Sequence, residues 1–174
     1  MNSDFRDLLR IFNAGKVRYL VVGGYAVMKY AEPRYTKDLD LWIDATPKNA
    51  RAVFKALKEF GAPLANLTEA DFSREGFFYQ MGRPPARVDI VMSIEGVRFA
   101  DAWRERVATD FDGVPGQVIG RKHLITNKRA VGRPQDLMDV TNLLESERVG
   151  EKPLQESETR KKKRPKGRDR GMGR

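Results

Sequence analysis

The chain has 174 residues, of which 40% are hydrophobic, and this length and composition suit one folded domain. It contains no cysteine and one histidine, which excludes a disulfide framework, a thiolate zinc site, a cysteine nucleophile and any site built from several histidines. Thirty-three lysines and arginines against 24 acids give a net charge of +9. No apolar run approaches the ~18 residues of a membrane span, and residues 1–12 lack the pattern of a signal peptide. We therefore expect a soluble, cytoplasmic protein without a membrane partner.

Most of the positive charge lies at the C-terminal end of the chain. Residues 151–174 contain ten lysines and arginines and four acids, for a net charge of +6. This segment is poor in large apolar residues, so it cannot bury enough surface to offset the entropy lost on ordering. We expect a folded domain over 1–150 and a disordered basic tail over 151–174.

The hydrophobic periodicity predicts a domain that mixes helices and strands. In the first half of the chain we expect a helix over 3–14, a strand over 18–22, a helix over 24–30, a strand over 39–44 and a helix from 47 to Gly61. A helical turn over 68–74 and strands over 76–80 and 87–94 follow. The rest is expected to form a helix over 99–107, a weak hairpin of 109–111 with 117–119, and helices over 121–130 and from 134 onward. The aromatic residues 77–79 are expected in the core, with a platform for base stacking as the alternative. The last helix is expected to bury Leu137, Val140, Leu143 and Leu144. The predicted fold class is α+β (mixed α/β), with a small mixed sheet flanked by helices.

The strand expected over 39–44 is rich in aspartate. Side chains of a strand alternate between two faces, so the apolar residues 39, 41 and 43 share one face. Asp38 and Asp40 share the other face, about 6.6 Å apart along the strand. Aspartate is depleted in strands, so the pair indicates either a solvated strand edge or a cation held between the two carboxylates. Asp44 is interpreted as a carboxylate at the strand end.

A second predicted strand also carries an aspartate on the face opposite its apolar residues. Over 87–94 the apolar residues alternate, and Asp89 points away from them. If the two strands are neighbours in one sheet, Asp89 joins Asp38 and Asp40 across about 4.8 Å. Three carboxylates without histidine or cysteine suit Mg²⁺, which completes its shell with water and phosphate oxygens. The set therefore indicates phosphoryl or nucleotidyl transfer with one or two metal ions.

Gly23 and Gly24 end the first predicted strand and open a helix. Their backbone N–H groups can face a phosphate at the positive end of that helix, because glycine permits close approach. A simple turn is the alternative interpretation of such a pair.

These residues together resemble the DNA polymerase β-type nucleotidyltransferase superfamily. The resemblance is carried by Gly23-Gly24, by Asp38-Leu39-Asp40 after thirteen intervening residues, and by Asp89 inside an apolar strand. The stretch 21–43, with Arg34 and Thr36 before the aspartates, resembles the small nucleotidyltransferases grouped with the AbiEii-type toxins. The resemblance covers about residues 17–145.

The resemblance implies roles for each of these positions. The catalytic and metal-binding residues would be Asp38, Asp40 and Asp89: the first two bind two Mg²⁺ ions, and the third completes one site and helps to activate the acceptor hydroxyl. The glycine pair would hold the phosphates of an NTP, with Arg34 and Thr36 as further nucleotide-binding residues. Many members have Gly-Ser where this chain has Gly-Gly, which leaves backbone contacts alone.

The AbiEii-type toxins also carry a lysine motif followed by paired aspartates. Lys122, Lys128, Asp136 and Asp139 partly match it, which makes the two lysines candidates for binding the triphosphate. Exposed helix lysines are the alternative. Asp136 lies just inside a predicted helix start, where the helix dipole also accounts for it.

The prediction that combines these features is a Mg²⁺-dependent nucleotidyltransferase that moves a nucleoside monophosphate from an NTP to a hydroxyl of RNA, a protein or a small molecule. A toxin–antitoxin component is one form that such an enzyme takes. The small domain leaves little room to bind an acceptor, so a cognate antitoxin or a homodimer is expected as partner. Two alternatives stay open: a catalytically inactive regulatory protein of the same fold, and a nucleic-acid-binding protein that acts through its basic tail.

Overall fold

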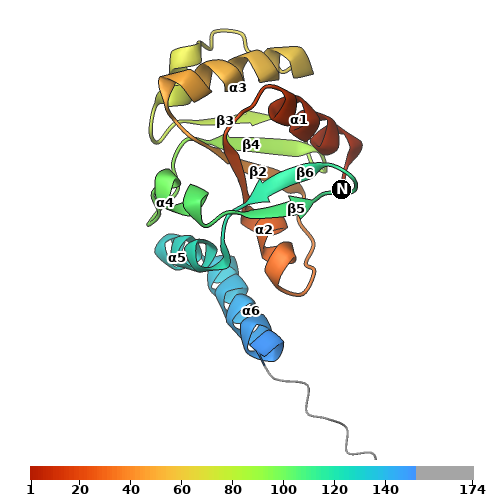
Figure 1. Ribbon diagram of the computed structural model, residues 1–174, viewed down its shortest axis with the longest axis vertical. Coiled ribbons are helices and arrows are strands. Elements are labelled where there is room, and N and C mark those ends of the chain that lie inside the picture. Colours follow the sequence, from red (N-terminus) through yellow and green to blue (C-terminus); the bar gives the residue numbers. More distant parts are fainter. Residues whose placement is uncertain (152–174) are drawn as a thin grey trace, which may run out of the picture.

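The computed structural model describes residues 1–151, and Figure 1 shows how their helices and strands are arranged. The bounds are α1 (Ser3–Ala14), β1 (Tyr19–Val22), α2 (Gly23–Tyr30), β2 (Asp38–Ile43), α3 (Pro47–Phe60), the 3₁₀ helix η1 (Glu69–Ser73), β3 (Phe78–Met81), β4 (Arg87–Val91), α4 (Phe99–Arg104), β5 (Val107–Asp110), β6 (Pro115–Val118), α5 (Arg121–Val131) and α6 (Pro134–Glu151). Nearly all of the tail predicted over 151–174 lies outside the described residues, so the tail and its boundary stay predictions.

The described strands form one six-stranded mixed sheet in the order β3-β4-β2-β1-β6-β5. β2 pairs with β1 antiparallel and with β4 in parallel, so it lies near the middle of the sheet. All four residues of β1 are buried, as expected for a central strand covered on both faces. The predicted fold class, a small mixed sheet flanked by helices, is confirmed.

Helices α1 and α3 cover one face of the sheet (Figure 1). α1 buries the apolar stripe expected of an amphipathic helix, namely Phe5, Leu8, Leu9 and Phe12. α3 begins after Thr46, whose side chain accepts a hydrogen bond from the backbone N–H of Asn49, and ends at Gly61 in the left-handed conformation. Both ends of α3 therefore fall where the sequence predicts them.

Helices α2, α5 and α6 lie on the opposite face of the sheet (Figure 1). In α6, Val140 and Leu143 are buried as predicted, but Leu137 is 50% exposed, so its predicted place in the core is wrong. The inward positions of the first turns are taken by Asp136 and Asp139, which are both buried. Two carboxylates can face inward here because cations from α5 and from the segment before β2 lie opposite them.

The largest differences from the predicted bounds are at the ends of one strand and one helix. The strand predicted over 87–94 ends at Val91, whose partner Trp42 is the last residue of β2 to pair with β4. The helix predicted over 99–107 ends at Arg104, because Val107 begins β5 and pairs with Val118. A hairpin between β5 and β6 forms, but its strands cover 107–110 and 115–118 instead of the predicted 109–111 and 117–119.

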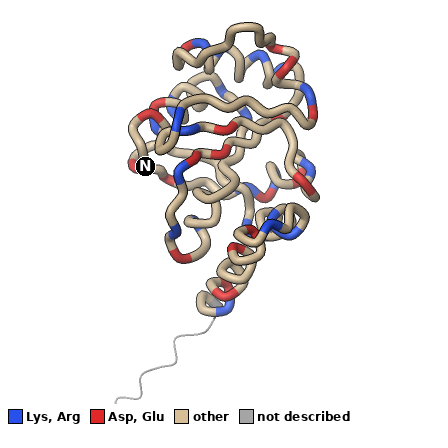
Figure 2. The backbone as a smooth tube through the Cα atoms, turned by 180° about the vertical axis from the view of Figure 1, so that it is seen from behind, with Lys and Arg blue, Asp and Glu red and all other residues tan. Residues whose placement is uncertain are grey.

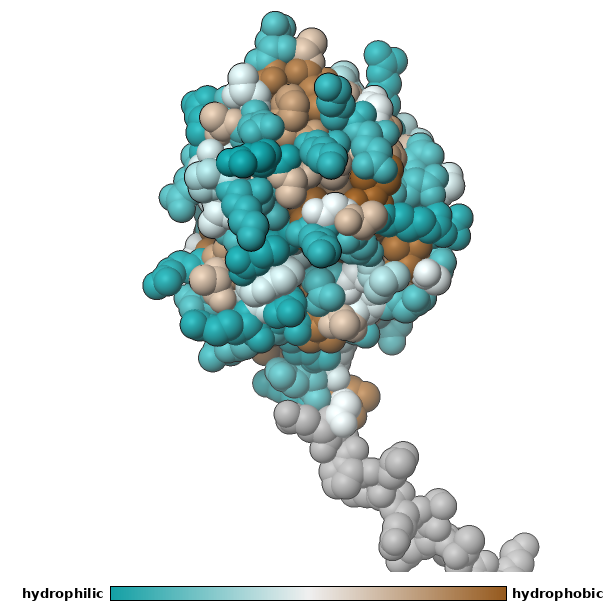
Figure 3. Space-filling model, turned by 45° about the horizontal axis from the view of Figure 1, so that its top comes forward, coloured by the Kyte–Doolittle hydropathy of each residue, from teal (hydrophilic) through white to brown (hydrophobic). Residues whose placement is uncertain are grey.

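Charged residues of both signs are interspersed along the described backbone (Figure 2). The face shown in Figure 3 is mostly hydrophilic, with small separate hydrophobic patches. Residues 1–150 have a net charge of +3, so two thirds of the net charge of +9 lies in residues 151–174. Within residues 1–151, no helix is long and apolar enough to cross a lipid bilayer.

Candidate active site

Asp38, Asp40 and Asp89 line one cleft of about 650 Å³. β2 and β4 are parallel neighbours, and their register sets Asp40 beside Asp89 and Asp38 beside Arg87. Alternate residues of a strand share a face, so all four side chains project from the same face of the sheet. The structure thus brings together the three aspartates that the sequence selects.

The positive charge around Asp40 is too small to keep its carboxyl group fully ionised at neutral pH. Desolvation, together with the charges of Asp89 and Asp38, raises the pKa of Asp40 from 3.8 to about 7. Lys128 and Arg87 act in the opposite direction without cancelling the effect. A cation bound in the cleft would supply the missing charge and favour the ionised form of Asp40.

The guanidinium of Arg87 contacts two of the three aspartates. Its Nη2 atom is 2.5 Å from Asp38 Oδ2 and 3.3 Å from Asp89 Oδ2. Gln80 Nε2 donates a hydrogen bond to Asp89 Oδ1 at 2.9 Å. The other oxygen of Asp38, Oδ1, is buried and has no hydrogen-bond partner among the described residues. Neither Arg87 nor Gln80 stands out in the sequence, since a polar residue in an alternating strand is normally one that faces solvent.

The donor chemistry of this cleft fits Mg²⁺. The candidate ligands are carboxylate oxygens, Asp38 Oδ1 lacks a partner, and Asp40 lacks compensating charge. In the conformation described for residues 1–151, no three acidic or histidine side chains already form a metal-binding cluster. Arg87 provides the positive charge beside Asp38 and Asp89 in this state.

Gly23 and Gly24 begin α2 beside the aspartates, and neither position has room for a side chain. Gly23 has a φ of 61°, and a Cβ atom there would lie 2.0 Å from Asp40 Oδ2. A Cβ atom on Gly24 would lie 2.5 Å from Thr36 Oγ1, which itself donates a hydrogen bond to the carbonyl oxygen of Asp38 at 3.4 Å. The glycine pair therefore packs the first turn of α2 against the carboxylates. The free N–H groups of such a helix start can bind an anion.

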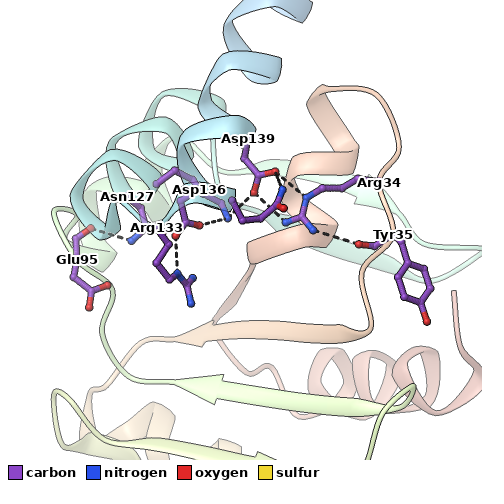
Figure 4. A network of polar contacts seen from close by, with 9 residues as sticks. Arg34, Tyr35, Glu95, Asn127, Arg133, Asp136 and Asp139 are labelled. Atoms are coloured by element: carbon purple, nitrogen blue, oxygen red, sulfur yellow. Dashed lines mark hydrogen bonds and ion pairs between the residues drawn. The ribbon is translucent and has the colours of Figure 1, made fainter.

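Lys128 of α5 is held by two buried carboxylates of α6. Its Nζ atom lies 2.7 Å from Asp136 Oδ1 and 2.9 Å from Asp139 Oδ2. Arg34 pairs with Asp139 through Nε at 2.8 Å and through Nη2 at 3.0 Å, and Arg133 Nε lies 2.7 Å from Asp136 Oδ2 (Figure 4). These five residues form the cation–carboxylate network of the cleft.

The network carries a net charge of +1, because three cations face two carboxylates. Burial alone would raise the pKa of Asp139, but hydrogen bonds from Lys128 and Arg34 outweigh it, and the pKa lies below its ordinary value. Burial acts on Asp136 in the same way and is outweighed by Arg133 and Lys128, so the pKa of Asp136 is also lowered. Both aspartates are therefore ionised, and the network ties α6 to α5 and to the segment before β2.

The candidate nucleotide-binding residues do not all reach the cleft. Arg34, Thr36 and Lys128 line it, whereas Lys122 is exposed and lies outside it. Six residues of an α-helix turn through about 600°, so Lys122 and Lys128 point about 120° apart around α5. Since Lys128 faces inward, the structure does not bring Lys122 to the site.

The position of Phe78 contradicts the prediction that residues 77–79 belong to the core. Its side chain is 63% exposed and lines the cleft, while Tyr79 is buried. Phe78 lies two residues before Gln80 on β3 and shares its face. An exposed aromatic ring at this place offers a surface on which a planar ring can stack. The sequence favoured the core for this residue over a stacking surface, because aromatic residues in strands usually pack inward.

Comparison of the three-dimensional structure with solved structures finds a similar protein, the lincosamide antibiotic adenylyltransferase LnuA in its lincomycin-bound crystal structure. The match has a TM-score of 0.53 at 15% sequence identity, and it covers 83% of this chain and 96% of that chain. The chain has a nucleotidyltransferase-like fold. This confirms the fold expected from the resemblance to the polymerase β-type superfamily.

Comparison of the sequence gives no match. No protein-family model matches the chain, and no curated protein sequence matches it. The finer resemblance to the AbiEii-type toxins therefore rests on the motifs alone and stays a prediction.

Proposed function

We propose that this protein is a Mg²⁺-dependent nucleotidyltransferase that transfers a nucleoside monophosphate from an NTP to a hydroxyl group. The observation that carries the proposal is the meeting of Asp38, Asp40 and Asp89 with Gly23 and Gly24 in one cleft. The nucleotidyltransferase-like fold supports the same reaction class.

In this reaction the acceptor oxygen forms a bond to the α-phosphorus of the NTP, and the bond between the α-phosphorus and the bridging oxygen breaks to release pyrophosphate. Asp38, Asp40 and Asp89 would hold the metal ions, which supply charge neutralisation at the transferring phosphoryl group. Asp89 would also take the proton of the acceptor hydroxyl. Its hydrogen bond with Gln80 fixes the direction of its carboxylate.

The phosphates of the NTP would lie at the start of α2. Gly23 and Gly24 offer backbone N–H groups there, and the side chain of Arg133 is largely exposed at the cleft. Lys128 is already engaged by two carboxylates. Its role would be to fix Arg34 and Arg133 through those carboxylates while adding to the positive field of the cleft.

A label-transfer assay tests the proposal. Each NTP, labelled in its α-phosphate, is incubated with the full chain, Mg²⁺ and total RNA, cell protein or a panel of small hydroxylated molecules. Label should move to one acceptor class, and chelation of Mg²⁺ with EDTA should stop the transfer. Asp40→Asn should abolish it, whereas Asp44→Asn should not, because Asp44 pairs with Arg18 away from the cleft. Full activity of Asp40→Asn would exclude the proposed site.

The acceptor panel follows from the chain and from its structural neighbour. LnuA was solved with lincomycin bound, so lincosamides belong among the small molecules. The basic residues 151–174 favour an RNA acceptor, and a protein acceptor is the third class. A cognate antitoxin or a second copy of the chain would be the partner that completes acceptor binding, and a copurifying protein or a dimer on gel filtration would reveal it.

One observation favours a second candidate function, that of a catalytically inactive regulatory protein with the same fold. Arg87 already pairs with both Asp38 and Asp89, and the described residues hold no preformed metal cluster. An inactive protein would bind neither Mg²⁺ nor NTP, so isothermal titration with each ligand separates the two candidates.

A further inference from the structure

We infer that Arg87 is an internal counter-ion of the metal site, which pairs with Asp38 and Asp89 while no metal is bound and leaves them when a divalent cation binds. The inference rests on the proposed function, because it takes Asp38, Asp40 and Asp89 as metal ligands. It goes beyond that function by making metal binding a displacement step.

The position of Arg87 is set by the sheet and not by a loop. Arg87 and Asp89 lie two residues apart on β4 and share a face, and the parallel register places Arg87 directly opposite Asp38. The resulting Nη2 distances are 2.5 Å to Asp38 and 3.3 Å to Asp89. The guanidinium therefore contacts one carboxylate oxygen of each of two aspartates on the face where the metal would bind.

A divalent cation and this guanidinium compete for the same carboxylates. Mg²⁺ binds carboxylate oxygens at about 2.0–2.1 Å, whereas an arginine so close to the same oxygens would face strong repulsion from the metal. Metal binding therefore requires the ion pairs of Arg87 to open. The Arg87 side chain is 32% exposed, which leaves it room to change rotamer at the cleft surface.

Displacement of Arg87 has a consequence for the order of binding. The released guanidinium lies in the cleft that would receive the triphosphate, and its planar fork matches the geometry of a phosphate group. A metal ion that arrives alone breaks two ion pairs without replacing them. A metal ion that arrives with an NTP brings a phosphate that becomes the new partner of the guanidinium. The affinity of the protein for the metal should therefore be low without nucleotide and higher with it.

Isothermal titration calorimetry of the full chain with Mn²⁺ alone, at pH 8, tests the inference. Arg87→Met removes the competing charge and should bind Mn²⁺ at least tenfold more tightly than the wild type. Arg87→Lys keeps the charge and should retain the weak affinity of the wild type. Arg83→Met is the matched control and should change nothing, because Arg83 is exposed just before β4 and makes no ion pair with any described residue.

Thermal unfolding gives an independent readout. Without metal, Arg87→Met should lower the Tm by about 3 °C, since Asp38 and Asp89 lose their partner. Saturating Mn²⁺ should remove this difference. A Tm deficit that persists at saturating Mn²⁺, or a Mn²⁺ affinity of Arg87→Met equal to or weaker than that of the wild type, would overturn the inference.

The outcomes separate this inference from the proposed function. If the wild type binds Mn²⁺ and transfers label while Arg87→Met has unchanged affinity, only the inference fails. If neither the wild type nor Arg87→Met binds Mn²⁺ and no label moves, the proposed metal site fails and the inference with it.

Discussion

At the scale of single residues, Gly23 and Asp40 occupy adjoining space that leaves no room for one more carbon atom. Gly23→Ala should lower the free energy of unfolding by about 2–4 kcal/mol, since the positive φ alone costs about 1–2 kcal/mol and the new methyl group displaces the Asp40 carboxylate. Urea denaturation measures the loss. Gly61→Ala is the control, because Gly61 has a φ of 84° with nothing within 4 Å. Equal losses for the two variants would show that the contact with Asp40 does not matter.

Replacement of Asp40 should raise the thermal stability of the protein and lower its activity. Above its pKa of about 7, Asp40 carries a charge that desolvation and two neighbouring carboxylates disfavour. At about pH 8.5 the metal-free Asp40→Asn variant should therefore unfold about 2–4 °C higher than the wild type, and the gain should fade below pH 7. The same change should lower the rate of nucleotidyl transfer at least about 1000-fold, because metal binding needs a charged oxygen ligand. Differential scanning calorimetry with the label-transfer assay checks both. A lower Tm would mean that repulsion at Asp40 is not the dominant effect.

At the scale of elements, the cation–carboxylate network fastens α6 to the rest of the domain. Lys128→Met leaves two buried aspartates, which are 2% and 0% exposed, without their shared cation. The expected loss is about 3–5 kcal/mol of unfolding free energy, the usual cost of breaking a buried ion pair from one side. Arg129→Met changes the neighbouring exposed residue of α5 and should cost less than about 0.5 kcal/mol. A loss below 1 kcal/mol for Lys128→Met would show that water reaches the two carboxylates.

The same network should make the protein sensitive to acid. The pKa values of Asp136 and Asp139 are lowered from 3.8 in the folded state, so the unfolded chain takes up protons first. The stability that they contribute is present above pH 3.8 and is lost as the pH falls through their folded-state values. Urea denaturation between about pH 6 and 2.5 should show this decline. The decline should be smaller in Asp139→Asn, and an identical curve would contradict the assignment.

The elements also show what the sequence can and cannot predict. The two aspartate-bearing strands were predictable because alternation fixes which side chains share a face, and the parallel register then brought Asp40 beside Asp89. The inward-facing aspartates of α6 were not predictable from periodicity, because a periodicity argument assigns aspartate to solvent and leucine to the core. Asp136 and Asp139 reverse this rule since Lys128 and Arg34 meet them from other elements. Lys128 lies only eight residues before Asp136, and the motif resemblance already grouped the two. Arg34 lies 105 residues from Asp139, and no local pattern reveals that pair.

At the scale of the whole molecule, the charge distribution leads to a prediction for the tail. Residues 151–174 hold +6 of the net charge of +9. Truncation after Gly150 should raise the KM for an RNA acceptor and leave kcat unchanged, because contacts to phosphates are equally strong in the ground and transition states. The difference should disappear between about 50 and 200 mM salt. Steady-state kinetics of both forms test this, and an unchanged KM would show that the tail does not recruit the acceptor.

The positions of the cleft residues along the chain determine when the cleft can first form during synthesis. Asp38 pairs with Arg87 across 49 residues, and Arg34 pairs with Asp139 across 105 residues. Contacts of such separation form late in folding, because they close long loops. A nascent chain leaves the ribosome from its N-terminus, so β2 emerges well before β4, and α6 emerges last of the described elements. Translation therefore keeps Asp38 apart from Arg87, and Arg34 apart from Asp139, until the later residue of each pair has been made.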